Sequence, residues 1–360
     1  MRPVSVAYDL VPEQITVGGI ARYAVELRRA LTVREDVRLV PVGPRARRRD
    51  RSAHRWTQGL RREMWHHTIG LDRAARAARA DVVHCPGALA PARSALPLVL
   101  TVHDVLPLVH PGLFPRTTVA HQRLVLARRA RRAARVIVNT AHVRGQVKDV
   151  LGVAEERVRV VPCGVAARFR PTPPDPAWLH ERFGLDRPYL LAVGNLEPRK
   201  NLLGAVRGLR AAGLGDEVAL VVAGAQGWRN DVFEREAPRA GVPLVMTGRV
   251  SDEELVRLYS GARCLVFPSL YEGFGLPALE AMACGCPVIS SDRCGLPEVV
   301  DDAALLVDPL DPQAIGSAIR ALVGDEERRA ELCERALVRA AGMSWERVGA
   351  QTVDVYREVV

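Results

Sequence analysis

The sequence predicts an α/β protein of two doubly wound domains, each a parallel sheet with helices on both faces. Three observations support this fold class. Short apolar runs alternate with longer amphipathic stretches, a proline-rich segment interrupts the series once, and 360 residues exceed what one hydrophobic core usually takes. We therefore expect two sheets that face a cleft, with ligands bound at the carboxyl ends of their strands.

The first half of the chain contains six apolar runs of strand length, separated by stretches with helical periodicity. The expected strands are residues 4–8, 37–42, 82–84, 98–103, 136–139 and 158–162. The clearest expected helices are residues 21–31, 71–80 and 117–134. An arginine cluster at residues 45–51 is expected in an exposed loop.

The segment P-T-P-P-D-P, residues 171–176, contains four prolines that cannot continue a helix or a central strand. It is the expected linker between a first domain, residues 1–170, and a second domain, residues 177–343. A last amphipathic stretch, residues 344–360, opens with Ser344 as a helix N-cap; it could pack on either domain, and we assign it to the first. The expected strands of the second domain are residues 189–193, 218–223, 244–247, 264–267, 288–290 and 305–307.

Composition narrows the class of protein. Hydrophobic residues at 48% and charged residues at 26% are typical of a folded globular chain. No apolar run reaches the roughly 18 residues of a membrane-spanning helix, and the N-terminus lacks the apolar core of a signal peptide, so we expect a cytoplasmic protein. Seven scattered cysteines without zinc-site spacing indicate core positions, and no bound metal is expected.

Charge is distributed unevenly between the two halves. Residues 1–170 carry 31 Lys and Arg against 13 Asp and Glu, net +18, whereas the rest carries 20 against 28, net −8. A basic half could contact anionic lipid, a charged acceptor or, nonspecifically, nucleic acid. It lacks aromatic interleaving, so no specific nucleic-acid binding is expected. The arginines that could meet lipid, or form a merely solvated helix face, are Arg128, Arg129, Arg131, Arg132 and Arg135.

The turn G-N-L-E-P-R-K-N follows an expected strand and begins at Gly194. A glycine turn lets backbone N–H groups approach a ligand, and the adjacent Arg199 and Lys200 could neutralise phosphate. A solvated surface turn is the alternative. Only two of the 51 basic residues are lysines, so the compact ammonium group at Lys200 favours a phosphate site.

The stretch S-L-Y-E-G-F-G-L-P-A-L-E, beginning at Ser269, holds two glutamates eight residues apart, Glu272 and Glu280. Pro277 suits the first turn of a helix, so the preceding loop would lie over a helix N-terminus that favours anions. Glu280 would then sit in the first turn. Carboxylates accept hydrogen bonds from paired hydroxyls, as a ribose or a hexose offers. The alternative is a dipole-stabilising Glu280 and a surface Glu272.

These segments resemble the retaining glycosyltransferases of family 4, which have the GT-B fold of two Rossmann-like domains, and in particular the mannosyltransferase-like members. The glutamate pair matches the E-x7-E signature of these enzymes. The resemblance covers nearly the whole chain. Further similar segments are V-G-G-I-A-R-Y at 17–23, T-V-H-D-V-L-P at 101–107, V-V-A-G-A-Q-G-W at 221–228, T-G-R-V-S-D-E-E-L at 247–255 and M-S-W-E-R-V at 343–348.

The resemblance implies a role for each matching residue. Arg199 and Lys200 would bind the donor diphosphate, Glu272 the sugar hydroxyls, Glu280 the ribose, and His103 the sugar across the cleft. His103, Glu272, Arg199 and Lys200 are the expected catalytic residues, although a histidine at a strand end is also typical of a structural hydrogen bond. The other donor-binding residues implied are Gly18, Gly19, Gly194, Arg249, Val250, Phe274, Gly275 and Leu276.

The implied reaction is transfer of a hexosyl group, with retention, from a GDP-sugar or UDP-sugar to an acceptor hydroxyl. Many glycosyltransferases hold a divalent cation with a D-x-D motif; this sequence contains none, so we expect catalysis without metal or cofactor. The acceptor could be a glycan, a lipid-linked glycan or a small molecule, as in bacterial glycan or natural-product glycosylation. Contact with the inner face of a membrane would be peripheral.

Other functions remain as alternatives. A nucleotide-sugar epimerase or a phosphorylase shares the two-domain architecture. A nicotinamide-dependent enzyme is disfavoured because no G-x-G-x-x-G follows the first strand. A basic nucleic-acid-binding protein is the most remote alternative, since only the charge of the first half supports it.

Overall fold

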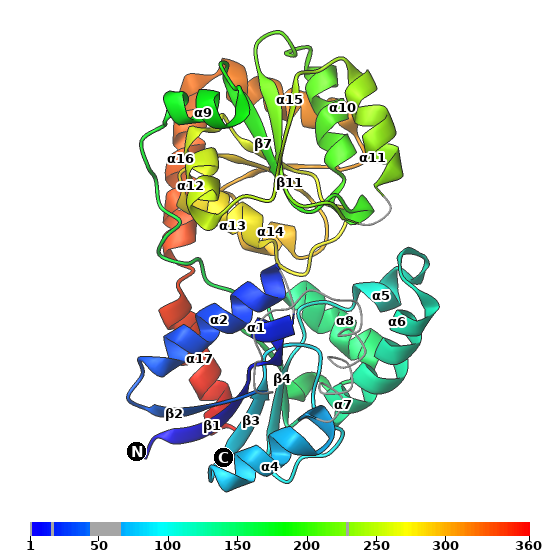
Figure 1. The fold of residues 1–360 in the computed structure, drawn as a ribbon, viewed down its shortest axis with the longest axis vertical. Coiled ribbons are helices and arrows are strands. Elements are labelled where there is room, and N and C mark those ends of the chain that lie inside the picture. Colours follow the sequence, from blue (N-terminus) through cyan, green and yellow to red (C-terminus); the bar gives the residue numbers. More distant parts are fainter. Residues whose placement is uncertain (1, 16–17, 44–65, 228–229) are drawn as a thin grey trace. The chain divides into compact units, whose positions relative to one another are not determined.

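The computed structural model describes residues 2–15, 18–43, 66–227 and 230–360. The chain forms two compact units: Met1–Gly164 together with Trp345–Val360, and Val165–Ser344. Each contains a six-stranded parallel sheet with helices on its faces (Figure 1). The arginine cluster at 45–51, and Val17 and Trp228 of the family-like segments, lie outside the described residues.

The sheet of the first unit has the strand order β2-β1-β3-β4-β5-β6. Its strands are β1 (Val4–Asp9), β2 (Val37–Val42), β3 (Val82–Cys85), β4 (Leu98–Thr101), β5 (Arg135–Val138) and β6 (Val158–Val160). Its helices and helical turns are α1 (Val11–Ile15), α2 (Gly19–Thr32), η1 (His66–Gly70), α4 (Leu71–Ala77), α5 (Leu106–Val109), η2 (Pro111–Leu113), α6 (Arg116–His121), η3 (Gln122–Leu126), α7 (Ala127–Arg132), α8 (Ala141–Leu151), η4 (Glu155–Arg157) and α17 (Trp345–Arg357).

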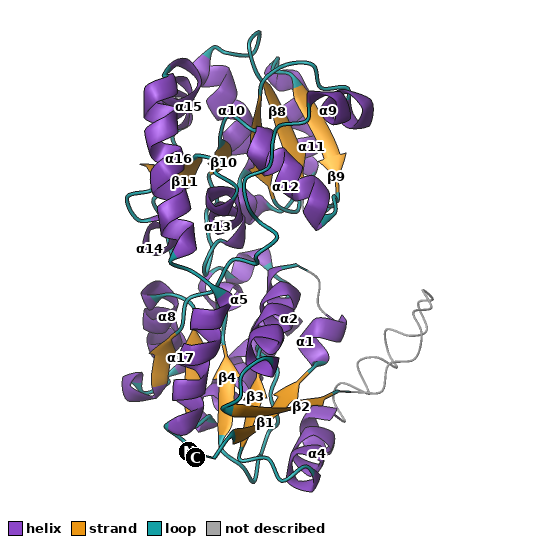
Figure 2. Ribbon diagram, turned by 90° about the vertical axis from the view of Figure 1, so that its left-hand side faces the viewer, coloured by secondary structure: helices purple, strands orange, loops and turns teal. Residues whose placement is uncertain are grey.

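Helices on both faces explain why the strands of this sheet read as continuous apolar runs. All six residues of β1 are buried, as expected for a parallel strand covered on both sides. Capping residues set both ends of the helix α8. At its start the Thr140 side chain accepts a hydrogen bond from the Val143 N–H, and the helix ends at Gly152, which has the left-handed conformation. Figure 2 shows the alternation of strands and covering helices.

The C-terminal helix α17 belongs to the first unit, where it packs on α2. Its Tyr356 hydroxyl lies 2.6 Å from Nδ1 of His84 in β3, and Nε2 of His84 lies 2.9 Å from the Thr101 hydroxyl in β4. Burial lowers the pKa of His84 to about 3, so this imidazole is neutral. The helix is therefore held to the sheet by a neutral buried hydrogen-bond chain.

The sheet of the second unit has the strand order β12-β11-β10-β7-β8-β9. Its strands are β7 (Tyr189–Val193), β8 (Ala219–Ala223), β9 (Leu244–Gly248), β10 (Leu265–Phe267), β11 (Val288–Ser291) and β12 (Leu305–Val307). Its helices and helical turns are α9 (Pro176–Phe183), η5 (Pro198–Lys200), α10 (Leu202–Ala212), α11 (Asp231–Glu236), η6 (Ala237–Ala240), α12 (Asp252–Gly261), α13 (Leu276–Ala283), α14 (Leu296–Val300), α15 (Pro312–Gly324) and α16 (Glu326–Ala341).

The fold class and the strands expected from the sequence are confirmed. All twelve strands are present, with ends displaced by two residues at most. Five of the seven cysteines are buried, as their apolar surroundings predicted. None of the helices in the described ranges is long and apolar enough to span a membrane.

The division between the units differs from the expected one. It falls after Gly164, so the proline-rich segment lies within the second unit. Two contacts anchor it there: the side chain of Arg168 pairs with Asp252 at the start of α12 at 2.8 Å, and the backbone N–H of Thr172 donates to the Ser260 hydroxyl at 3.2 Å. The prolines prevent regular structure without freeing the segment, and Asp175 caps α9.

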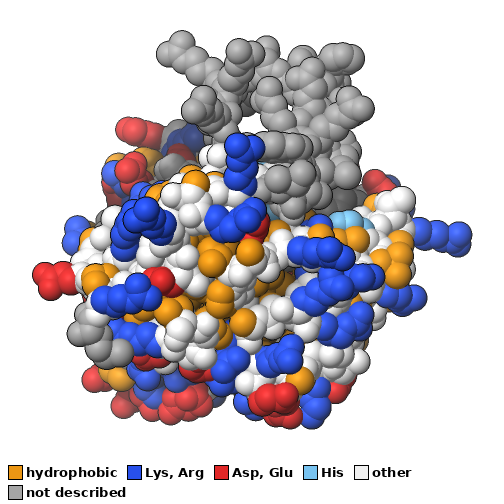
Figure 3. Space-filling view, turned by 90° about the horizontal axis from the view of Figure 1, so that it is seen from below, with side chains coloured by type: hydrophobic (Ala, Val, Ile, Leu, Met, Phe, Trp, Pro, Cys, Tyr) orange, Lys and Arg blue, Asp and Glu red, His pale blue; other side chains and the backbone are white. Residues whose placement is uncertain are grey.

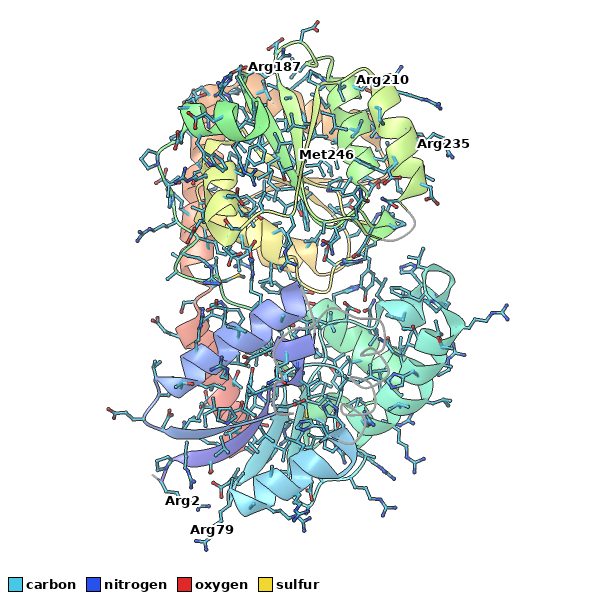
Figure 4. All side chains as sticks on the ribbon, in the orientation of Figure 1. Arg2, Arg79, Arg187, Arg210, Arg235 and Met246 are labelled. Atoms are coloured by element: carbon cyan, nitrogen blue, oxygen red, sulfur yellow. The ribbon has the colours of Figure 1, made fainter. Side chains whose placement is uncertain are left out.

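Basic side chains of the chain are widely spread. Arg2 and Arg79 project from the first unit and Arg187, Arg210 and Arg235 from the second (Figure 4). On the face seen in the space-filling view, Lys and Arg side chains are interspersed with acidic and apolar surface (Figure 3). Among the described side chains visible there, the basic groups are therefore separated by acidic and apolar surface, with several of them adjoining on the right-hand side of the view.

Candidate active site

The candidate active site lies where the strand order of the second unit reverses. The chain runs outward from β7 through β8 to β9, and then returns to the other side of β7 with β10. In doubly wound sheets, ligands bind beyond the carboxyl ends of the two strands at such a switch point. The turn beginning at Gly194 follows β7, and the loop containing Glu272 follows β10. Topology therefore brings two distant sequence motifs to one edge.

At this edge Glu272 is the shared partner of two cations. The Lys200 Nζ donates to Glu272 Oε1 at 2.5 Å, and an Arg199 guanidinium nitrogen donates to Glu272 Oε2 at 3.2 Å. The Ser269 hydroxyl also donates to Oε1 at 2.9 Å. The Arg199 Nε donates a second hydrogen bond, to Glu197 Oε2 at 2.9 Å. The sequence prediction that Arg199, Lys200 and Glu272 share one site is thus consistent with this geometry.

The two central groups are buried ions. Glu272 and Lys200 are each 8% exposed, and the Lys200 Nζ lies 5.2 Å from the ring centroid of Phe267. Burial alone would raise the pKa of Glu272, but the charges of Lys200 and Arg199 and the hydrogen bonds from Lys200 and Ser269 outweigh it and lower that pKa. Burial lowers the pKa of Lys200, and the charge of Glu272 opposes that shift. The carboxylate and the ammonium group stabilise each other.

The turn that carries the two cations is held by hydrogen bonds to neighbouring loops. Asn201 adopts a left-handed conformation, and its Nδ2 donates to the carbonyls of Pro268 and Pro309 at 3.1 and 2.7 Å. The Leu270 N–H donates to the Arg199 carbonyl at 2.7 Å. These bonds join the turn after β7 to the loops after β10 and β12, and the two bonds to the β10 loop set the distance between Lys200 and Glu272.

Sequence reasoning missed several residues that support this arrangement. Ser269, Glu197 and Asn201 lie inside or beside the quoted motifs, yet only the folded contacts reveal their partners. Gly224, after β8, is a further case: a Cβ at this position would lie 1.9 Å from the Gly194 carbonyl oxygen. The signal in the sequence was a glycine directly after a buried strand.

The predicted helix after Glu272 is confirmed, but the expected place of Glu280 is wrong. The helix α13 begins at Leu276, after Gly275 as its N-cap and with Pro277 in its first turn. Glu280 therefore lies in the second turn, where it is buried and accepts from the Tyr259 hydroxyl at 3.3 Å. The helix starts at Leu276 because Gly275, with φ of 105°, cannot extend it in the N-terminal direction.

The other donor-binding residues expected in the second unit lie at the same edge of the sheet. Gly194 follows β7, and its Cα faces the stem of Lys200, since a Cβ there would lie 3.1 Å from Lys200 Cδ. Arg249 follows β9 and is exposed, and Val250 beside it is half-buried. Phe274 is buried in the loop before α13.

The donor-binding and catalytic residues expected in the first unit differ in exposure: the two glycines are exposed, and His103 is hydrogen-bonded inside the unit. Gly18 has a φ of 94° and, like Gly19 at the start of α2, is exposed. His103 lies just after β4, with Nδ1 2.9 Å from Asn139 Oδ1 and Nε2 3.0 Å from the Pro86 carbonyl. Burial lowers the pKa of His103, and its ring packs edge-on against Tyr23. Both ring nitrogens thus have partners within this unit, so contact with a sugar requires one to be exchanged.

Two family models match the chain in succession. Residues 17–169 match the glycosyltransferase family 4 domain, and residues 180–339 match the glycosyl transferases group 1 domain. An O-antigen chain mannosyltransferase B of Escherichia coli is 30% identical over 267 residues, covering 72% of this chain and 70% of that protein. The chain belongs to glycosyltransferase family 4.

Other relatives and solved structures agree with this family. A D-inositol 3-phosphate glycosyltransferase of Catenulispora acidiphila is 33% identical over 354 residues, covering 90% of the family 4 chain and 81% of the relative. Sucrose-phosphate synthase of Thermosynechococcus elongatus has a TM-score of 0.77 at 21% identity, with 99% of each chain covered. Anabaena HepE in complex with UDP-glucose has a TM-score of 0.75 at 18% identity, covering 98% and 99% of the two chains. The fold is therefore GT-B, and the protein is a glycosyltransferase.

Proposed function

We propose that this family 4 transferase moves a hexosyl group from a nucleotide-diphosphate sugar to an acceptor hydroxyl. The observation that carries the proposal is the cluster of Arg199 with the buried Lys200 and Glu272 at the switch point of the second unit. Two adjacent cations suit a diphosphate, and a carboxylate beside them suits sugar hydroxyls. Relatives named as mannosyltransferases favour GDP-mannose, and a GT-B neighbour in complex with UDP-glucose keeps UDP-sugars open.

The same cluster accounts for the chemistry of transfer. Breaking the anomeric C–O bond leaves negative charge on the departing diphosphate, and fixed cations stabilise this charge more in the transition state than in the ground state. Glu197 and Glu272 hold the two cations in place before the donor binds. The bound diphosphate would form ion pairs with the two cations and so weaken their contacts with Glu272. The Glu272 carboxylate could then accept hydrogen bonds from the sugar. His103 would join from the first unit after exchanging a partner.

We further propose retention of anomeric configuration by attack on the face that the diphosphate leaves, with the leaving phosphate accepting the acceptor's proton. Nothing about the two glutamates requires a covalent intermediate: Glu272 is held by cations and Glu280 by Tyr259. The anomeric coupling constant of the purified product, measured by proton NMR, tests this. An inverted product would exclude the mechanism.

Donor binding is expected to stabilise the protein against heat. A nucleotide at 100 times its dissociation constant raises the free energy of unfolding by about 2.7 kcal/mol. Thermal unfolding is measured with UDP, GDP, ADP and dTDP in turn. We expect one of these nucleotides to raise the unfolding temperature of the wild type, and we expect no such increase in Lys200→Ala. A rise that persists in the variant would place the diphosphate elsewhere. Product mass then separates transfer from epimerisation, which leaves mass unchanged.

Transfer is expected to need no added Mg²⁺ or Mn²⁺, because Arg199 and Lys200 would supply the positive charge that a metal ion otherwise supplies at the diphosphate. Turnover should be the same after extensive dialysis and after addition of either ion. A strong increase on addition would contradict the proposal.

The acceptor is proposed to be a glycan, a lipid-linked glycan or a small molecule bound by the first unit, with peripheral membrane contact as one consequence of its basic charge. Of the arginines considered for such contact, Arg135 already pairs with Glu358 at 2.6 Å, and Arg129 is only partly exposed. Arg128, Arg131 and Arg132 on α7 remain exposed. Binding of the purified protein to anionic vesicles, and its loss on charge reversal at these three arginines, tests this contact.

A further inference from the structure

The first unit holds a second cluster of chemically reactive side chains that the transfer reaction does not use. Asp9 ends β1, and His66 and His67 begin the helical turn η1. The His66 Nε2 lies 3.0 Å from Asp9 Oδ1, and the His67 Nε2 lies 2.9 Å from Asp9 Oδ2. One ligand atom from each of the three residues lies within 4.8 Å of the other two.

All three side chains are buried. Asp9 is fully inaccessible, and His66 and His67 are 5% and 2% exposed. Both oxygens of the Asp9 carboxyl group thus lie away from water, each within hydrogen-bond distance of an imidazole nitrogen. A buried carboxylate requires a cationic partner.

No lysine or arginine supplies that charge among the residues that the structure describes. The ion pairs of Asp9 there are with His66 and His67 alone, and its one further hydrogen bond comes from the Val11 N–H at 3.1 Å. Each carboxylate oxygen faces an imidazole nitrogen. Within the described part of the chain, the site thus presents two imidazoles and a carboxylate, with no lysine or arginine paired to that carboxylate.

We propose that Asp9, His66 and His67 form a binding site for a divalent transition-metal ion, with Zn²⁺ the best match. Two imidazoles and one carboxylate are a common zinc set, completed by a fourth, non-protein ligand. Zinc bonds of about 2.0–2.2 Å place neighbouring ligand atoms about 3.4 Å apart. The two imidazoles contact different oxygens of Asp9, at 3.0 and 2.9 Å, and one ligand atom from each of the three residues already lies within 4.8 Å of the others, so side-chain adjustments would bring the three around one ion.

The position of the cluster in the fold supports a ligand rather than simple packing. The first sheet reverses its strand order between β1 and β3, so Asp9 lies at the carboxyl end of a strand at the switch point. Side chains at such an edge face the ligand-binding region of a doubly wound sheet. Imidazole ligands suit zinc and not magnesium, so this site is independent of the expected insensitivity of transfer to Mg²⁺.

Metal content decides the proposal. Protein carrying no histidine tag is loaded with Zn²⁺, passed through a desalting column and analysed for metal. We expect one Zn²⁺ per chain in the wild type, and at least a tenfold loss of retained Zn²⁺ in Asp9→Asn and in His67→Gln. The control is His180→Gln, because His180 also contacts an aspartate, Asp186, but both are exposed. The control should retain the wild-type amount.

Two outcomes overturn the proposal: a wild type that retains no stoichiometric Zn²⁺, or ligand variants that retain as much as the control. If Asp9→Asn and His67→Gln fail to fold, Co²⁺ titration of the wild type decides. A visible absorption band that saturates at one Co²⁺ per chain and disappears on adding Zn²⁺ supports the site. Absence of that band overturns it.

Discussion

Replacing Lys200 with methionine is expected to lower the turnover number about 10²–10³-fold, the usual effect of removing one group that stabilises developing negative charge. The same substitution should lower the free energy of unfolding by about 3–5 kcal/mol, because Glu272 would remain buried without its closest cation. Arg199 still contacts Glu272, which favours the lower end of that range. Turnover with the donor identified by thermal unfolding, and urea denaturation, measure the two effects.

The chain offers a matched control for this substitution. Lys148 is its only other lysine, and it forms an exposed pair with Glu155 at 3.0 Å. Lys148→Met should change neither turnover nor stability measurably, because exposed pairs contribute little. Equal losses in both variants would show that the effect at Lys200 does not come from the buried site.

Replacing Glu272 with glutamine is expected to lower the turnover number about 10–10²-fold, the loss of one charged hydrogen bond to the substrate. Nucleotide affinity should change little, because the proposed diphosphate ligands Arg199 and Lys200 remain and lose a competing carboxylate. The expected signature is therefore a reduced turnover number with an almost unchanged dissociation constant for the nucleotide. A large loss of nucleotide affinity would contradict the assignment of Glu272 to the sugar.

Stability gives a second test of Glu272. Its pKa is lower in the folded protein than in the unfolded chain, so its contribution is complete above the unfolded pKa and is lost as the pH falls through the folded pKa. Wild-type stability should thus fall more steeply in acid than that of Glu272→Gln. Identical acid profiles would show that the carboxylate is not stabilised as the structure indicates.

The double variant Lys200→Met with Glu272→Gln separates stability from catalysis. Neutral side chains replace both buried ions, so most of the stability lost in Lys200→Met should return. Turnover should stay low, because the double variant lacks both the ammonium group proposed to bind the diphosphate and the carboxylate proposed to bind the sugar hydroxyls. If the double variant is active, the cluster has only a structural role.

Parts of the fold and of the site could be predicted because they depend on residues close together in sequence. Central strands such as Val4–Asp9 and Ala219–Ala223 are buried throughout and mainly apolar because helices cover both faces of each sheet, so they were visible as patterns. The edge strand Leu305–Val307 is partly exposed, but its residues are apolar as well. The turn beginning at Gly194 and the loop containing Glu272 were recognisable by their own residues. Family resemblance then predicted which of these residues share a ligand.

The sequence by itself determined the two wound sheets, the family and the motif residues Arg199, Lys200 and Glu272. Only the tertiary structure decided their partners. The switch point joins loops 72 residues apart to pair Lys200 with Glu272, and Asp9 meets His66 across 57 residues of chain. Parallel strands place the ends of distant segments at one edge of a sheet, and no local pattern records which ends become neighbours.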